Sequence, residues 1–339
     1  MPLICVNMFF MNIIVKEVEK MVISFILLIV GFVLLVKGAD FFVEGSSTIA
    51  KYLKIPSIII GLTIVAMGTS APEAAVSIIA GMNGSNEIAV SNVIGSNMFN
   101  LLMVVGISAI IKPISIQNQI IKKDYPFMLM VTAVLAVMSF DIVITKGTEN
   151  IISRSEAIIL IIFMCVFMYS LISSALQSRK NSVEENNEKP KHSIPISIVF
   201  TLGGLAGIII GGQFVVDSAE KIALGFGMSE TLVGLTIVAV GTSLPELVTS
   251  IVAAKKGESD IAIGNVVGSN IFNILFVLAF SAVITPIGVN ALCLIDMLIL
   301  VAITIIAYIF CITKNKVNRV EGIALVAMYV MYMVYAIIR

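Results

Sequence analysis

Long apolar runs separated by short polar stretches make up most of the chain. Ten of these runs are about 20 residues long, which is the length that an α-helix needs to cross a bilayer. Barrel strands would be about 10 residues long with alternating polarity, and the sequence does not show that pattern. The runs predict spanning helices near residues 22–42, 56–80, 87–111, 125–145, 156–176, 195–216, 229–254, 261–285, 291–312 and 321–338.

One polar stretch, residues 177–194, divides these runs into two groups of five. It is rich in charged side chains and poor in apolar ones, so it is predicted to be a flexible linker. We therefore expect four parts. They are an N-terminal extension (1–20), a first five-helix repeat (21–176), the linker, and a second five-helix repeat (195–339).

The composition supports a membrane protein. Hydrophobic residues make up 59% of the chain and charged residues only 12%, whereas roughly 25% is usual in a soluble domain. The net charge is zero, so no nucleic-acid partner is expected. The four cysteines are scattered without CxxC spacing, which argues against a disulfide or a thiolate metal site. We expect a monomer in a lipid bilayer that needs no cofactor.

The two halves repeat the same two motifs at one constant offset. Gly-Leu-Thr-Ile-Val-Ala-Met-Gly-Thr-Ser-Ala-Pro-Glu, over 61–73, returns over 234–246 with eleven of thirteen positions identical. Ile-Ala-Val-Ser-Asn-Val-Ile-Gly-Ser-Asn-Met-Phe-Asn, over 88–100, returns over 261–273. Five spans in each half would invert the second half relative to the first, as in many secondary transporters.

The distribution of Lys and Arg predicts the orientation in the membrane. Fifteen of the 21 lie near the loops that follow the odd-numbered runs, and six lie on the opposite side. Cytoplasmic loops are enriched in these residues. We therefore expect a multi-pass protein of the cell membrane with a cytoplasmic linker and both termini outside.

The first motif places a hydroxyl and a carboxylate on one helix face beside a proline. Thr69 and Glu73 are at positions i and i+4 and so share a face. Pro72 should break the helix and free nearby carbonyls such as that of Ala66. Broken helices at membrane depth occur where they line a cavity. Ser70 adds a second hydroxyl, and the matching oxygen donors of the second copy are those of Ala239, Thr242, Ser243 and Glu246.

The second motif adds Ser96 and Asn100, and in the other half Ser269 and Asn273. Every side chain in this set offers a hydroxyl, carboxylate or amide. The single histidine, His192, lies in the linker. Hard cations such as Na⁺, Ca²⁺ and Mg²⁺ prefer oxygen ligands, and six to eight mixed oxygens suit Ca²⁺ better than Mg²⁺. The sequence therefore predicts a cation site.

The two carboxylates also suggest exchange of ions. Each charged carboxylate at mid-membrane costs about 2.5–3.5 kcal/mol on insertion scales. One divalent cation, or two or more monovalent cations, would neutralise both. Competition for the same two charges is a physical basis for an antiporter rather than an enzyme.

The doubled Gly-Thr-Ser-x-Pro-Glu and Gly-Ser-Asn-x-Phe-Asn motifs resemble those of the sodium/calcium exchanger family, and most closely its short prokaryotic members. The resemblance implies ten helices in an inverted repeat. It also implies four cation sites between the second, third, seventh and eighth helices, past which the first and sixth helices slide.

By this resemblance, Ca²⁺ would bind chiefly to Glu73, Glu246, Thr69 and Thr242. Sodium would use Ser70, Ser96, Ser243 and Ser269, and Asn100, Asn273 and the carbonyls of Ala66 and Ala239 would complete the set. The expected function is Na⁺/Ca²⁺ antiport, with electrogenic Ca²⁺ extrusion.

The chain departs from the family pattern at Asn273, where some members have Asp. This departure argues against K⁺ cotransport. Proton-coupled calcium exchangers usually have Gly-Asn-x-x-Glu in place of Gly-Thr-Ser-x-Pro-Glu, so a H⁺-coupled exchanger of the same fold is the nearest alternative. An intramembrane protease would need a motif such as HExxH, which is absent from the sequence. A passive channel would more often be built from symmetric subunits or loop filters.

Overall fold

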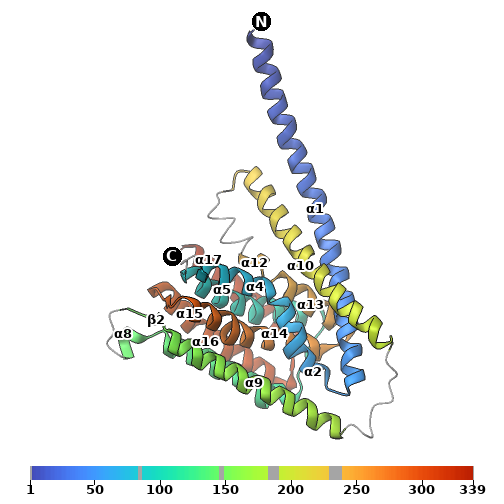
Figure 1. The fold of residues 1–339 in the computed structure, drawn as a ribbon, viewed down its shortest axis with the longest axis vertical. Helices are drawn as coiled ribbons and strands as arrows, with labels where there is room; N and C mark the ends of the chain where they lie inside the picture. The colour runs from blue at the N-terminus through green and yellow to red at the C-terminus, as the bar shows by residue number, and fades with distance from the viewer. Residues whose placement is uncertain (1, 83–85, 145–148, 182–190, 229–238, 339) are drawn as a thin grey trace.

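The computed structural model describes residues 2–82, 86–144, 149–181, 191–228 and 239–338, and these residues are almost entirely helical (Figure 1). In the first half the elements are α1 (Pro2–Leu53), α2 (Ser57–Ile60), η1 (Gly61–Val65), α3 (Ala66–Thr69), α4 (Ala71–Met82), α5 (Asn86–Phe99), η2 (Asn100–Val104), α6 (Val105–Ile111), β1 (Ile114–Ser115), η3 (Ile120–Asp124), α7 (Tyr125–Met138), α8 (Asp141–Ile144), β2 (Ile151–Ile152) and α9 (Arg154–Asn181).

The second half has a matching order of elements. They are α10 (Ile194–Gly225), α12 (Ala239–Gly241), α13 (Leu244–Lys256), α14 (Ser259–Phe272), η5 (Asn273–Leu278), α15 (Ala279–Ile284), β3 (Ile287–Gly288), α16 (Ala291–Ile312), η6 (Thr313–Asn315), β4 (Lys316–Val317) and α17 (Arg319–Ile338). The segments η1, η2, η3 and η5 are π-helical, and η6 is a 3₁₀ turn.

Seven helices among the described residues are long and apolar enough to cross a membrane, and eight if the bent pair Ser57–Thr69 and Ala71–Met82 is one span. The predicted total of ten is not reached for two reasons. The fourth predicted span, 125–145, is shifted: η3 and α7 form one helix over 120–138, which carries Lys122, Lys123 and Asp124 near its start and ends before the turn at Ser139. The seventh, 229–254, lies partly outside the described residues.

The predicted boundary between positions 20 and 21 is not marked by a break in the helix. Helix α1 runs continuously from Pro2 to Leu53, and its N-terminal part extends beyond the rest of the molecule in Figure 1. The predicted N-terminal extension therefore continues the first span as helix.

Two short antiparallel ribbons connect the halves. β1 pairs with β4, and β2 pairs with β3. Thus the loop after α6 meets the loop after α16, and the loop before α9 meets the loop after α15. β1 and β3 occupy equivalent positions in the two repeats, so each repeat contributes the equivalent strand to one ribbon.

Two helices from the different halves, α1 and α10, pack closely through glycines. A Cβ added at Gly38 would lie 2.8 Å from the carbonyl oxygen of Gly204, and one added at Gly204 would lie 2.5 Å from the main-chain nitrogen of Phe42. Small residues allow such close approach between membrane helices. Helices α1 and α10 therefore pack together as one unit.

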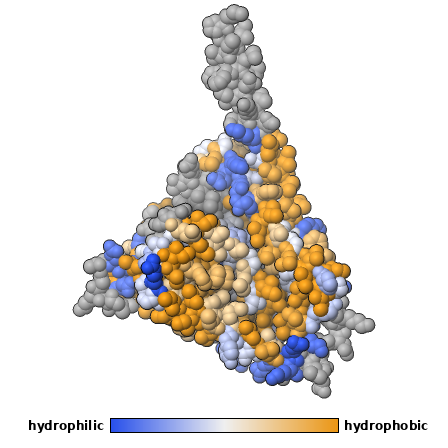
Figure 2. All heavy atoms as spheres, in the orientation of Figure 1, coloured by the Kyte–Doolittle hydropathy of each residue, from blue (hydrophilic) through white to orange (hydrophobic). Residues whose placement is uncertain are grey.

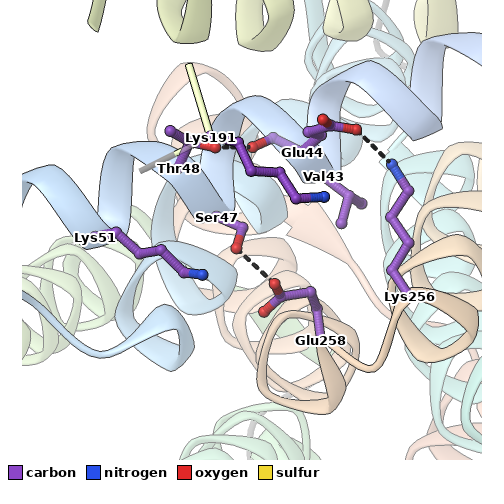
Figure 3. Close-up of a pocket in the computed structure, with 8 residues that line it drawn as sticks. All are labelled: Val43, Glu44, Ser47, Thr48, Lys51, Lys191, Lys256 and Glu258. Atoms are coloured by element: carbon purple, nitrogen blue, oxygen red, sulfur yellow. Dashed lines mark hydrogen bonds and ion pairs between the residues drawn. The ribbon is translucent and has the colours of Figure 1, made fainter. Parts of the chain in front are cut away.

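A polar cavity of about 160 Å³ lies between α1, Lys191 just before α10, and the segment that joins α13 to α14. Lys256 forms an ion pair with Glu44 at 3.3 Å, and Ser47 donates to Glu258 at 2.6 Å (Figure 3). Lys256 also forms an ion pair with Asp40 at 3.5 Å. These contacts connect α1 to the end of α13 and the start of α14. The lining residues are Val43, Glu44, Ser47, Thr48, Lys51, Lys191, Lys256 and Glu258.

The surface and the interior differ as expected for a membrane protein. Apolar side chains cover much of the visible face in Figure 2, and hydrophilic ones gather in patches. Helices α9, α10 and α17 expose many large apolar side chains, whereas α5 and α14 are mostly buried. The two central helices are those that contain the second repeated motif.

The close approach of α1 and α10 makes a direct prediction. Gly204→Ala should destabilise the protein by about 1–3 kcal/mol, because the new methyl group would overlap main-chain atoms of α1. Thermal unfolding in detergent measures this loss. Gly203→Ala is the matched control, since a Cβ at Gly203 meets nothing within 4 Å, and it should cause no loss. Equal stability of the two variants would contradict the packing.

Candidate cation site

The first motif occurs once in each half, and in both copies the helix is broken at the serine that lies two residues before the proline. Ser70 has φ −80° and ψ 6°, and Ser243 has φ −93° and ψ 7°, so both leave the helical conformation. In the first half the two helix segments are bent by 49°. Pro72 and Pro245 are each the second residue of the helix that follows, where proline is tolerated. The predicted proline breaks are confirmed.

The two glutamates lie in the first turn after these breaks. Glu73 belongs to α4 and Glu246 to α13, and both side chains are fully buried. The N-terminus of a helix has a partial positive charge that favours a carboxylate. The breaks therefore place each glutamate at a helix N-terminus, whose partial positive charge stabilises a negative charge in the interior.

A serine from the opposite half donates to each carboxylate. Ser70 Oγ donates to Glu246 Oε1 at 2.9 Å, and Ser243 Oγ donates to Glu73 Oε1 at 2.9 Å. These crossed hydrogen bonds bring the two broken helices together. Since Ser70 and Glu73 lie in one turn, and Ser243 and Glu246 in another, the four side chains form one buried cluster.

The serines of α5 and α14 complete this cluster. Ser96 Oγ lies 3.5 Å from Glu73 Oε1 and 3.1 Å from Ser243 Oγ. Ser269 Oγ lies 3.4 Å from both Glu246 Oε1 and the carbonyl oxygen of Ala66. The structure thus places the predicted serines of both motifs and the predicted Ala66 carbonyl side by side.

Four asparagines connect α5 and α14 across the centre. Asn97 Nδ2 donates to the carbonyl of Asn270 at 3.2 Å, and Asn270 Nδ2 returns a bond to the carbonyl of Asn97 at 3.3 Å. Asn100 Nδ2 donates to Asn270 Oδ1, and Asn273 Nδ2 to Asn97 Oδ1, each at 3.1 Å. With their nitrogens engaged in this way, Asn100 and Asn273 keep their amide oxygens free.

A π-helical turn begins at each of these two ligand candidates, at Asn100 in η2 and at Asn273 in η5. Such turns interrupt the regular hydrogen bonding of a helix and are frequent at functional sites. Neither turn is predicted from the sequence, because neither segment contains a proline.

Within the described part of the chain, five buried oxygens of the predicted set have no hydrogen-bond partner. They are Glu73 Oε2, Glu246 Oε2, Asn100 Oδ1, Asn273 Oδ1 and Thr242 Oγ1. A buried polar atom without a partner is destabilising by about 1–3 kcal/mol, and more when charged. Four of these atoms can only accept, so a hydrogen-bond donor or a cation would satisfy them, and a cation would also offset the charge of the two carboxylates.

The threonines and alanines are placed less symmetrically. Thr69 Oγ1 lies 3.0 Å from Asn265 Oδ1, 3.1 Å from the carbonyl of Val65 and 3.3 Å from that of Ala66. Ala239 is the first residue of α12. The main-chain nitrogen of Ser70 still donates to the Ala66 carbonyl at 3.0 Å, so this carbonyl, expected to be freed, keeps a helical partner.

The donor set fits a hard cation. Among the described residues no three His, Cys, Asp or Glu side chains gather into a metal cluster, so the site has two carboxylates surrounded by hydroxyl and amide oxygens. Flexible coordination by mixed oxygens is typical of Ca²⁺, and the same ligand type suits Na⁺.

Known proteins of similar sequence include transporters of hard cations. The sodium/calcium exchanger protein family matches the chain over residues 23–173 and 196–338. The inner membrane protein YrbG of Escherichia coli is 35% identical over 71% of this chain and 74% of its own length. The sodium/calcium exchanger MaX1 of Methanosarcina acetivorans is 33% identical over 88% of this chain and 93% of its own.

Solved structures agree as well. A structure of the sodium-calcium exchanger NCX_Mj, soaked with Na⁺ and without Ca²⁺, matches with a TM-score of 0.80 and 32% identity, over 93% of this chain and 99% of that one. The fold and site define a multi-pass, all-α membrane transporter of ions. The chain belongs to the sodium/calcium exchanger family, in its short prokaryotic form. Its family is one of antiporters rather than enzymes.

The unpartnered oxygens predict stabilisation by Ca²⁺. At a free concentration about one hundred times its Kd, Ca²⁺ should stabilise the folded protein by about 2.7 kcal/mol, measured by thermal unfolding in detergent. Glu73→Gln and Glu246→Gln should lose this effect. Glu156→Gln, which changes a glutamate that bonds Ser153 away from the cluster, should keep it. A full Ca²⁺ response in Glu246→Gln would exclude this carboxylate as a ligand.

Proposed function

We propose that this protein exchanges Na⁺ for Ca²⁺ across the membrane by alternating access and extrudes Ca²⁺ electrogenically. The observation that supports this function best is the pair of buried glutamates, each with one oxygen bound by a serine of the other half and the other oxygen without a partner. Such a pair attracts positive charge to the two oxygens that the protein does not engage.

Exchange follows from the number of charges. One Ca²⁺ neutralises both carboxylates, and so do two or more Na⁺, so the two ions compete for one pair of charges. Without an ion both charges are uncompensated, and each raises the free energy of the protein in the membrane by about 2.5–3.5 kcal/mol. The loaded states are therefore favoured over the unloaded one, which couples the exit of one ion to the entry of the other.

We further propose ten spans in two inverted repeats of five. Three observations support this arrangement. The serine–glutamate and asparagine hydrogen bonds between the halves recur at the offset of the repeated motifs. The family matches each half separately, and exchanging the two halves converts one ribbon into the other. The expected ligands are Thr69, Ser70, Glu73, Ser96, Asn100, their counterparts Thr242, Ser243, Glu246, Ser269 and Asn273, and the carbonyls of Ala66 and Ala239.

The proposed driving force combines the Na⁺ gradient with the membrane potential. An exchange of three Na⁺ for one Ca²⁺ moves one net charge, worth about 2.3 kcal/mol per 100 mV. A tenfold Ca²⁺ gradient requires about 1.4 kcal/mol. We expect the monomer to carry out this cycle without a cofactor.

The transport prediction concerns the two glutamates. Reconstituted vesicles loaded with Na⁺ should take up radioactive Ca²⁺, and Glu73→Gln or Glu246→Gln should lower the rate more than about 100-fold. This fold-change corresponds to about 2.8 kcal/mol, which is the scale for losing one charged ligand in the interior. Uptake that persists in the double variant would contradict the site.

The same vesicles distinguish the driving ion. A pH gradient without Na⁺ should give no uptake above background, and K⁺ should not replace Na⁺. Uptake driven by the pH gradient alone would establish the H⁺-coupled exchanger instead. Glu156→Gln should transport like the unsubstituted protein, which controls for reconstitution.

The orientation prediction can be checked by labelling. With Cys5, Cys165, Cys293 and Cys311 replaced, Glu185→Cys should react with a membrane-impermeant maleimide only after the cells are opened. The reason is the excess of Lys and Arg on that side of the chain. Labelling of intact cells would instead place the linker outside the cell and both termini in the cytoplasm.

A further inference from the structure

We infer that Asn92 and Asn265 are positioning residues, which hold the two glutamate-bearing turns in register with the ligands of the neighbouring helices. This inference rests on the proposed cation site. Neither residue belongs to the expected ligand set.

In the first half, one amide group joins two helices. Asn92 Nδ2 on α5 donates to the main-chain carbonyl of Glu73 at 3.3 Å and to Ser77 Oγ at 2.9 Å. Both acceptors lie on α4, one helical turn apart. The amide of Asn92 therefore fixes the turn that contains Glu73 against α5.

The second half repeats this contact. Asn265 Nδ2 on α14 donates to the main-chain carbonyl of Glu246 at 3.4 Å and to Ser250 Oγ at 3.0 Å. The donor and both acceptors stand at the positions equivalent to those of the first half, displaced by the offset of the repeated motifs. A chance packing contact would not be expected to recur with the same donor and the same two acceptors.

The position of each asparagine explains what it controls. Asn92, Ser96 and Asn100 occupy positions i, i+4 and i+8, so they share one face of the helix. The same holds for Asn265, Ser269 and Asn273. When Asn92 fixes the Glu73 turn, it also sets the separation between the Glu73 carboxylate and the Ser96 hydroxyl, which lie 3.5 Å apart.

The two asparagines differ in a second contact. Asn265 is fully buried, and its Oδ1 accepts from Thr69 Oγ1 at 3.0 Å. In the other half the hydroxyl of Thr242 has no hydrogen-bond partner among the residues that the structure describes. Asn265 thus joins α3, α13 and α14, whereas the amide nitrogen of Asn92 joins α4 and α5, so loss of Asn265 should have the larger effect.

Calcium titration of the full chain in detergent, by isothermal titration calorimetry, tests the inference. Asn265→Ala should raise the Kd for Ca²⁺ about tenfold, and Asn92→Ala about threefold, which is the range for losing one buried hydrogen bond. The milder variants Ser250→Ala and Ser77→Ala remove one acceptor each. They should raise the Kd about twofold to threefold even if Asn265→Ala fails to fold.

The matched control is Asn290→Ala. Asn290 Oδ1 accepts from the main-chain nitrogen of Cys293 at 2.8 Å at the start of α16, and this hydrogen bond involves no residue of the expected ligand set. This variant should lower the unfolding temperature and leave the Kd unchanged. A purely structural role for Asn92 and Asn265 would give the same result as this control.

A double-mutant cycle adds a sharper criterion. Thr69 is hydrogen-bonded to Asn265, so the effects of Thr69→Val and Asn265→Ala on the free energy of Ca²⁺ binding should not add. The effects of Thr242→Val and Asn92→Ala on this free energy should add. If the asparagine and serine variants lower the unfolding temperature but keep the Kd within the error of the unsubstituted protein, the inference is wrong. If the unsubstituted protein binds no Ca²⁺, the proposed function itself fails.

Discussion

The structure depends on one constraint, which is the burial of two carboxylates in an apolar interior. Glu73 and Glu246 are fully buried, and the protein satisfies only one oxygen of each through a side chain. The helix breaks, the helix ends beside the glutamates and the serines of the opposite half all lower the unfavourable energy of these charges. Together they stabilise the carboxylates without neutralising them, and in the proposed function a bound cation neutralises them.

Local chemistry made part of the site predictable from the sequence. Pro72 and Pro245 cannot continue a helix, so the breaks could be located, and the repeated motifs singled out the oxygen donors. The identity of the partners could not be predicted, because Ser70 bonds Glu246 rather than its neighbour Glu73. That choice depends on how two segments from opposite halves of the chain face one another.

Other features depend on tertiary structure in the same way. The π-helical turns at Asn100 and Asn273 have no proline to signal them. They occur where asparagine side chains of two buried helices form hydrogen bonds with one another. The end of α7 at Met138 is followed by Ser139 and Asp141, but the apolar residues around them continue the run, so average hydropathy alone did not locate it. The roles of Ser77 and Ser250 were also missed, although the two serines stand at equivalent positions of the two repeats, which was a usable signal.

The crossed bonds have a consequence for how such a protein can arise. Each half supplies the closer hydroxyl to the carboxylate of the other half, at 2.9 Å, so a single half keeps only the longer contact of its glutamate with Ser96 or Ser269. A lone half could build this pocket only by pairing with a second copy of itself in the same crossed manner. Joining the halves in one chain makes that pairing independent of concentration and lets Thr69 and Thr242 acquire different surroundings, which two identical subunits related by symmetry could not do.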